Sequence, residues 1–408
     1  MVTKRALIFL LLYAFSTIVI SANTFEDNIR VHGFGTLGLI KAGNDSLGYR
    51  YNVAQEALFD EYSLKQNSNI GIQFDFKVSK KIDLNLQLLT RDRINNSFNK
   101  SVQTAYINYK FNPSFELRLG RSATDVYMMS EYRQVSFAQI WAHAPTEFYG
   151  HLAVDFSDGI FGLWKKSLFD GFLRTRLWFS QGKYSYITTE EIEIDMQPMM
   201  GVSLSWENND WQLRLTYNQS YMDTNDGIFD SLEDALDMAV DLGWSQASQA
   251  SKDLSVNNSW VRYYATGVAY NHNNWLVQSE LGLITTETQL VGDIFTGYLS
   301  IGKRINSFTP FAMIGWSKTI TGRPNSPPAP APFSGLQQLS QDAFDLNYSD
   351  QKSLSLGVRW DIKHNIAIKA QWSRTWVDKY GGYLLAQPQP LSKNTQLDAY
   401  FLNVDFIF

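Results

Sequence analysis

The chain has 408 residues, of which 14% are aromatic and 18% are charged, with a formal net charge of −5 and no cysteine. An acidic, weakly charged chain is a poor partner for nucleic acid. A chain without cysteine also has neither disulfides nor thiolate metal sites, so its fold depends on hydrogen bonding and burial.

The N-terminus has the three parts of a secretory signal peptide. Lys4 and Arg5 give a positive start, an apolar stretch follows from Ala6 to Ile20, and Ser21 and Ala22 are small. A membrane anchor helix is the alternative, but the apolar stretch is shorter than the roughly twenty residues that such a helix needs. We therefore predict a signal peptide over residues 1–22 and a single mature domain over residues 23–408.

The mature chain alternates apolar and polar residues with a period of two. In the clearest segment, 70–78, the apolar members are Ile70, Ile72, Phe74, Phe76 and Val78. This period predicts strands with two different faces, and no helix could gather such residues on one stripe. Similar segments are 30–39, 82–88, 105–111, 115–119, 156–164, 173–179, 200–206, 211–217, 268–270, 275–283, 295–301, 308–316, 354–360, 366–372 and 402–408.

These sixteen segments are joined alternately by short and long connections. The short ones lie near 79–81, 112–114, 167–171, 207–210, 271–274, 304–307 and 361–365. A sheet spans a membrane only if it closes on itself, and such barrels have an even number of strands, short periplasmic turns and long external loops. We therefore predict an all-β, sixteen-stranded antiparallel transmembrane β-barrel. A large soluble secreted β-protein is the alternative.

Large aromatic residues beside the short turns favour the membrane protein. They are Phe111, Phe115, Trp206, Trp211, Tyr270, Trp275 and Trp360. Amphipathic rings concentrate where a membrane meets water, so these residues are predicted to form a periplasmic girdle. A soluble sheet has no reason to place rings beside every second turn.

The chain resembles the Gram-negative trimeric porins. The matching stretches are 31–38 (VHGFGTLG), 104–109 (TAYINY), 117–121 (LRLGR) and the terminal Phe408. Residues 145–149 (PTEFY) depart from the Pro-Glu-Phe-Gly-Gly motif of the general porins, and the chain is more similar to a less characterised branch from marine γ-proteobacteria. The resemblance implies an outer-membrane homotrimer in contact with lipid and lipopolysaccharide. It also implies that Phe408 is the signal for the outer-membrane assembly machinery, and that the third external loop folds inward.

By strand count, the third external loop covers residues 122–150. Its aromatic residues are Tyr127, Tyr132, Phe137, Trp141, Phe148 and Tyr149. A segment this apolar is poorly suited to bulk water, so we predict that it packs inside the barrel and constricts the pore. A loop packed over the mouth of the barrel is the alternative.

Charged residues are predicted on both sides of the constriction. Strand parity points Arg118, Arg174, Arg176, Arg214 and Lys369 into the lumen, and the loop supplies Asp125, Glu131 and Glu147. Opposed basic and acidic rows would create a transverse field that orders water and biases ion selectivity. The alternative is that these groups are merely solvated lumen side chains.

Two further loops have distinctive content. Residues Asp230 to Leu242 have helical spacing with an acidic face, and Glu190, Glu191, Glu193 and Asp195 form a second acidic patch. Solvated acidic faces are the simpler interpretation, and Ca²⁺ or Mg²⁺ binding is the alternative. The proline-rich stretch 323–332 predicts an irregular external loop.

Together these patterns predict a porin that passes small hydrophilic solutes and ions by passive diffusion, without a cofactor. A channel specific for an oligosaccharide or an organic acid is the first alternative. A barrel-borne surface hydrolase is the second, although the chain has no Gly-x-Ser-x-Gly, His-Glu-x-x-His or phosphate-loop motif.

Overall fold

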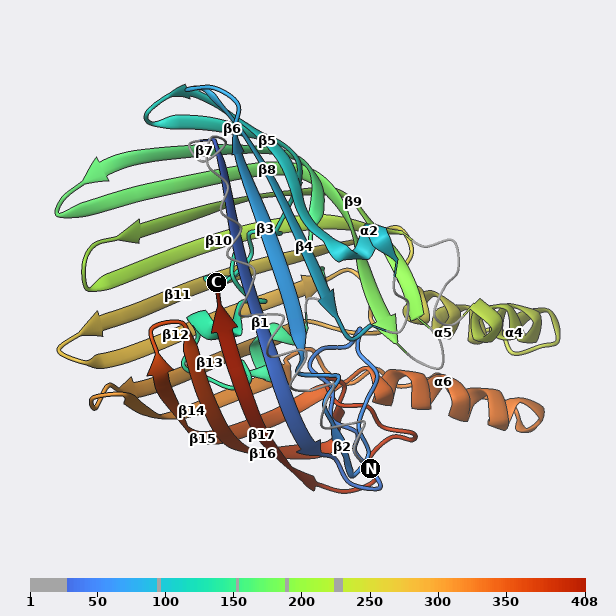
Figure 1. The fold of residues 1–408 in the computed structure, drawn as a ribbon. Helices are drawn as coiled ribbons and strands as arrows, with labels where there is room; N and C mark the ends of the chain where they lie inside the picture. The colour runs from blue at the N-terminus through green and yellow to red at the C-terminus, as the bar shows by residue number, and fades with distance from the viewer. Residues whose placement is uncertain (1–27, 94–96, 152–153, 188–190, 224–229) are drawn as a thin grey trace, which may run out of the picture.

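The computed structural model describes residues 28–93, 97–151, 154–187, 191–223 and 230–408. The predicted signal peptide therefore lies outside the described residues. Within them, sixteen long strands and one short strand form a single closed antiparallel sheet (Figure 1). The strands are β1 (Ile29–Ala42), β2 (Glu61–Ser63), β3 (Asn69–Lys77), β4 (Ile82–Arg91), β5 (Val102–Asn112), β6 (Phe115–Ser122), β7 (Ser157–Leu168), β8 (Gly171–Ile187), β9 (Glu191–Glu207), β10 (Trp211–Asp223), β11 (Ser259–His272), β12 (Trp275–Thr286), β13 (Ile294–Lys303), β14 (Phe308–Thr319), β15 (Ser349–Lys363), β16 (Ile366–Gly382) and β17 (Thr395–Ile407).

The barrel closes where the first and last strands meet. β1 pairs with β3 on one side and with β17 on the other, and Phe34 lies opposite Ile407. Beyond that pair, Gly33 and Phe408 exchange two backbone hydrogen bonds of 2.8 and 2.9 Å. The predicted sixteen-stranded barrel is thus confirmed, and each predicted segment falls in its own long strand. The strands reach further than the alternation indicated; β11, for example, begins at Ser259 rather than near 268.

Short turns gather at one end of the barrel and long connections at the other, as Figure 1 shows. We call these the short-turn end and the long-loop end. The turn between β11 and β12 illustrates the short kind, because Asn273 and Asn274 have φ angles of 50° and 67°. Two successive left-handed residues make the tight hairpin turn that matches strand twist, and asparagine tolerates that conformation.

The two faces of the sheet follow the predicted parity. On β10, Leu213 and Leu215 are exposed on the outer face, whereas Arg214 and Thr216 are buried on the inner face. At the closure of the barrel the outer face needs glycine, because a Cβ atom on Gly33 would lie 2.1 Å from the ring of Phe408. The terminal ring therefore covers the first strand.

Three connections of the long-loop end fold into the barrel. The inner loop (residues 123–156, between β6 and β7) includes η1 (Ser136–Ala138) and α3 (Thr146–Tyr149). The first loop (residues 43–60) and the last loop (residues 383–394) join it there. Leu47 and Leu385 from these two loops pack in one buried cluster with Ala142 of the inner loop and Phe401 of the wall. The predicted inward fold of the third loop is confirmed; the other two inward folds were not predicted.

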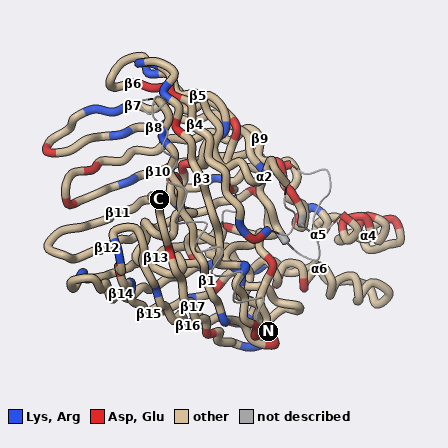
Figure 2. Tube along the Cα trace, viewed as in Figure 1, with Lys and Arg blue, Asp and Glu red and all other residues tan. Residues whose placement is uncertain are grey.

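The remaining helices lie at the long-loop end. They are α2 (Phe98–Ser101), α4 (Asp230–Asp241), α5 (Ala247–Leu254) and α6 (Ser334–Leu346), the last preceded by η2 (Ala331–Phe333). Leu236, Ala250 and Phe344 form a small core between α4, α5 and α6, which project beyond the strands in Figure 1. The predicted helix over 230–242 is α4, with its acidic residues displayed in Figure 2, and most of 323–332 is irregular as predicted. Among the described helices, none has the length and apolar character to cross a membrane.

Candidate functional site: the interior of the barrel

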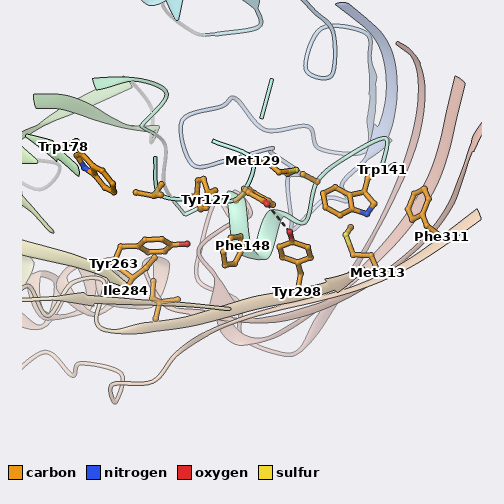
Figure 3. Packing of buried hydrophobic residues seen from close by; sticks show 14 of the residues in the cluster. Tyr127, Met129, Trp141, Phe148, Trp178, Tyr263, Ile284, Tyr298, Phe311 and Met313 are labelled. Carbon is orange, nitrogen blue, oxygen red and sulfur yellow. Dashed lines mark hydrogen bonds between the residues drawn. The ribbon is translucent and has the colours of Figure 1, made fainter. Parts of the chain in front are cut away.

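Aromatic packing holds the inner loop against the wall of β11–β14. Tyr149 lies 4.8 Å from Tyr127, and Tyr298 of β13 lies 5.4 Å from Phe148 and 5.6 Å from Trp141, measured between ring centroids. Figure 3 shows Tyr127, Trp141, Phe148 and Tyr298 in this packing. All five side chains belong to one buried cluster. Large rings that pack edge to face contribute packing energy beyond their burial, so the inner loop and this wall share one hydrophobic core.

A buried carboxylate, Glu280 of β12, fastens the same half of the loop. It accepts hydrogen bonds from the Tyr298 hydroxyl and the Met128 backbone N–H, both at 2.9 Å, and from the Tyr149 hydroxyl. These three hydrogen bonds satisfy a buried carboxyl group that would be costly to leave without partners. Sequence reasoning missed Glu280; the only available signal was an acidic residue between Ser279 and Leu281 in an otherwise weakly polar strand.

Two residues predicted to line the pore are instead buried anchors. The Glu147 carboxylate is 2% exposed and accepts a hydrogen bond from Gln351 Nε2 at 3.0 Å, and burial raises the pKa of Glu147. Lys369 is fully buried: its Nζ lies 2.9 Å from Asp405 and donates to the Ser136 and Trp141 carbonyls at 2.6 and 2.9 Å. The prediction that Glu147 and Lys369 face the water-filled path is wrong. The inner loop covers Lys369, and Glu147, which belongs to the loop, is buried against β15.

Five of the other predicted charges meet in one ion-pair network. The Arg176 guanidinium lies 3.1 Å from Asp125 and 2.5 Å from Glu131. Arg214 lies 2.8 Å from Asp125, and Arg118 lies 3.0 Å from Glu131. The predicted opposed rows across a water-filled gap are therefore incorrect. Asp125, Arg176 and Arg214 are buried in direct contact, since the inner loop runs along this wall rather than across from it.

Glu131 is the member of this network that remains in contact with water. Its side chain is 46% exposed, compared with 17% for Arg118 and 5% for Arg176. The Arg176 and Arg118 charges lower the pKa of Glu131 to about 2. Burial raises the pKa of Asp125, but Arg176 and Arg214 outweigh it, so that pKa also falls below its usual value. Both carboxylates are consequently charged at neutral pH.

The fifth predicted basic residue lies away from the loop. Arg174 contacts Glu207 at 2.6 Å near the short-turn end, and both side chains are partly exposed. Between the inner loop and the short turns of β9–β13 there is a cavity of about 390 Å³. Tyr132 and Gln139 of the loop line it, with Gln212 and Gln278 of the wall.

The wall of β3–β6 is the part of the interior that keeps polar groups in contact with water. Asp75 of β3 points inward by parity and its side chain is 37% exposed. Gln73, Gln87 and Tyr106, on the same inner face, are partly exposed. Among the described residues, no aromatic cluster comparable to the one on β11–β14 packs against this wall, so it provides the wetted side of the lumen.

The predicted girdle residues lie at strand ends beside the short turns. Phe111 and Phe115 face each other at 5.3 Å, and Trp211 and Tyr270 at 4.6 Å. The Trp206 indole N–H donates to the Leu168 carbonyl at 3.1 Å. Trp275 and Trp360 are exposed on the outer face, with Lys303 over the first ring and Phe308 beside the second.

The acidic patches are only partly described. Glu190 lies outside the described residues, as does the side chain of Glu191. Glu193 contacts Lys100 and Lys183, each at 2.9 Å, and Asp195 lies 3.7 Å from Lys183. Over the described ranges, no group of three or more acidic or histidine side chains is arranged to hold a metal ion.

Comparison with known proteins gives structural likenesses without sequence similarity. No family profile and no curated protein match the sequence. The outer-membrane channel DcaP of Acinetobacter baumannii superposes with a TM-score of 0.55 and 9% identity over 93% of this chain and 97% of its own. Salmonella typhi OmpF superposes with a TM-score of 0.54 and 11% identity over 93% of this chain and 98% of its own. An anion-selective porin from Comamonas acidovorans superposes with a TM-score of 0.53 and 11% identity over 93% of this chain and 99% of its own. These likenesses establish a shared barrel fold.

Proposed function

We propose that this chain is a porin of the Gram-negative outer membrane, which passes small hydrophilic solutes and ions by passive diffusion. The observation that carries the proposal is the closed barrel with an apolar outer face and a polar inner wall. Such a surface is suited to hydrocarbon on the outside and water on the inside. The fold shared with two porins and an outer-membrane channel supports it.

The solute path that fits the structure best runs between the inner loop and the wall of β3–β6. Glu131 borders it from the loop, and Asp75 and Arg118 border it from the wall. A ring of such charges biases ion selectivity. On this proposal the short-turn end is periplasmic and the long-loop end is external. The chain assembles as a homotrimer in contact with lipopolysaccharide, and Phe408 is read by the assembly machinery.

One observation favours a substrate-specific channel over a general one. Three loops, rather than one, fill the interior of the barrel and bury residues such as Leu47, Val53 and Leu384 completely. Less of the lumen then remains for water, so a narrow path that selects its solutes is expected. A catalytic role has no comparable support, and we propose none.

Reconstitution of the purified protein into planar lipid bilayers tests the proposal. Discrete conductance steps in KCl are expected from folded protein and not from a heat-unfolded sample. Folded protein that inserts but never conducts would contradict the porin assignment. Single-channel block by micromolar oligosaccharide or dicarboxylate would indicate the substrate-specific form, whereas unhindered passage of both would indicate a general porin. Chemical cross-linking in detergent measures the number of subunits.

A further inference from the structure

The cavity between the inner loop and the short turns of β9–β13 has a floor built by strand register. We call it the short-turn cavity. Gln212 of β10 lies opposite Ala269 of β11, Ala269 opposite Gln278 of β12, and Gln278 opposite Ser300 of β13. Gln212 and Gln278 each lie two residues before a buried inner-face residue, so their side chains point inward. The register thus places two amides in one row with a single methyl group between them, which leaves room above Ala269.

The inner loop forms the opposite side of the short-turn cavity, where Tyr132 and Gln139 line it. Hydrogen bonds fix the loop in this place. The Trp141 indole N–H donates to Ser300 Oγ at 2.6 Å, and Gln139 Nε2 donates to the Arg133 carbonyl at 3.0 Å. Because the loop is fastened to the same row of the wall, the cavity keeps a defined shape on both sides.

The groups that the short-turn cavity presents to water are amides and one phenol ring. Gln212 and Gln278 are partly exposed, and Tyr132 is 38% exposed. Gln278 Nε2 donates to the Tyr298 hydroxyl at 2.8 Å, which orients its amide. A side-chain amide has two N–H donors and an oxygen with two lone pairs, so this single bond leaves further donor and acceptor capacity for a ligand.

The charged side chains that line the short-turn cavity lie at its edge and hold partners of their own. These contacts join Glu207 with Arg174 at 2.6 Å, Asp210 with His272 at 2.9 Å, and Arg304 with Asn271 at 2.8 Å. The row from Gln212 to Ser300 carries no charged side chain. The floor of the cavity is therefore suited to a neutral polar molecule rather than to an ion.

A sugar combines the properties that this cavity matches. Each sugar hydroxyl both donates and accepts a hydrogen bond, as a side-chain amide does. The C–H groups of a sugar ring form an apolar face, which can pack against an aromatic ring such as that of Tyr132. The cavity volume of about 390 Å³ lies within the range of small-molecule sites.

We propose that the short-turn cavity binds a neutral sugar, with hydroxyl groups on Gln212 and Gln278 and the apolar face of the sugar against Tyr132. This inference rests on the proposed porin function and names its substrate class, since it assigns the substrate-specific form a neutral sugar as solute. On that proposal the short-turn end is periplasmic, so the site holds a sugar that has already passed the inner loop. Its binding is weak, because a transported solute has to leave again.

The test is a titration with maltose followed by saturation-transfer NMR, on folded protein in a detergent without a sugar headgroup. Gln212→Leu keeps the size of the side chain but removes the amide, and should weaken binding about tenfold, as expected for the loss of two hydrogen bonds. Ala269→Phe fills the space between the glutamines and should abolish binding. Gln396→Leu is the matched control, because Gln396 is exposed at the start of β17, and it should bind maltose like wild type.

A second comparison tests the class of ligand. Glucose and glucuronate differ by one carboxylate in place of a hydroxymethyl group. Glucose should bind the wild-type protein more tightly, because the row of amides offers the carboxylate no cation. Tighter binding of glucuronate would overturn the neutral class.

The outcomes separate the sugar site from the porin assignment, because binding in micelles does not require conduction. Equal maltose binding by wild type, Gln212→Leu and Ala269→Phe overturns the site, as does wild-type protein that conducts but binds no maltose. Protein that binds maltose but never conducts in planar bilayers keeps the site and loses the porin role. If Ala269→Phe does not fold, judged by its heat-modifiable mobility on electrophoresis, Gln212→Leu decides the question.

Discussion

Replacement of Lys369 by methionine should destabilise the barrel and release the inner loop. The ammonium group is fully buried, lies 2.9 Å from Asp405, and donates to two carbonyls of the inner loop. Removing it leaves a buried carboxylate that, among the described residues, keeps the Thr36 hydroxyl as a donor at 2.7 Å. Breaking one side of a buried ion pair costs about 3–5 kcal/mol, so the free energy of unfolding should fall by about that amount.

Denaturant unfolding in detergent, followed by tryptophan fluorescence, measures this loss. Lys369→Met/Asp405→Asn should lose less than the single variant, because no charge is then left unpaired. Lys363→Met, at an exposed position of β15, is the control and should change stability by about 0.5 kcal/mol or less. Current noise should rise in the single variant as the loop loses its donor. A loss below about 1 kcal/mol for Lys369→Met would refute the anchoring role.

Three further predictions concern the path and the closure of the barrel. Arg118→Ala should shift the reversal potential in a KCl gradient toward cation selectivity, whereas Glu147→Gln, at a buried position, should leave it unchanged; equal shifts would contradict the assigned path. Because the pKa of Glu131 is lowered to about 2, its charge and its stabilising ion pairs persist from pH 7 to pH 4 and are lost only as the pH falls through about 2. The difference in ion selectivity between wild type and Glu131→Gln should therefore stay constant between pH 7 and pH 4. A loss of that difference with a midpoint near pH 4.5 would contradict the lowered pKa. Phe408→Ala removes the ring that covers Gly33 and should reduce the folded, heat-modifiable fraction on electrophoresis; an unchanged fraction would argue against a role in assembly.

The strands were predictable because the side chains of each strand point alternately to the apolar outside and to the polar inside of the barrel. Apolar residues such as Leu213 and Leu215 face outward and Arg214 faces inward, so the period of two is visible without any knowledge of the neighbours. Strand ends beyond the alternation, and the helices α5 and α6, were missed. The helices are held by packing against one another, as in the cluster of Ala250 and Phe344. Such contacts produce no regular period in the sequence.

The sequence predicted which side chains point into the barrel, but not which groups they contact there. Parity correctly placed Arg176, Arg214 and Lys369 on the inner face, yet it could not show which carboxylate each one meets. Those ion pairs depend on the route of the inner loop through the barrel. The route in turn depends on contacts such as Glu280 with Tyr149, which join residues far apart in sequence. No local pattern encodes them.

The anchors of the inner loop constrain the order in which the molecule can be built. Asn403 of the last strand donates to the Ala142 carbonyl at 2.7 Å, and Asp405 beside it holds Thr36 of the first. The inner loop is synthesised early, but Asn403, which holds it, belongs to the last strand. A nascent polypeptide must therefore be kept from aggregating until its first and last strands pair, and one without the last strand would lack these anchors of the inner loop.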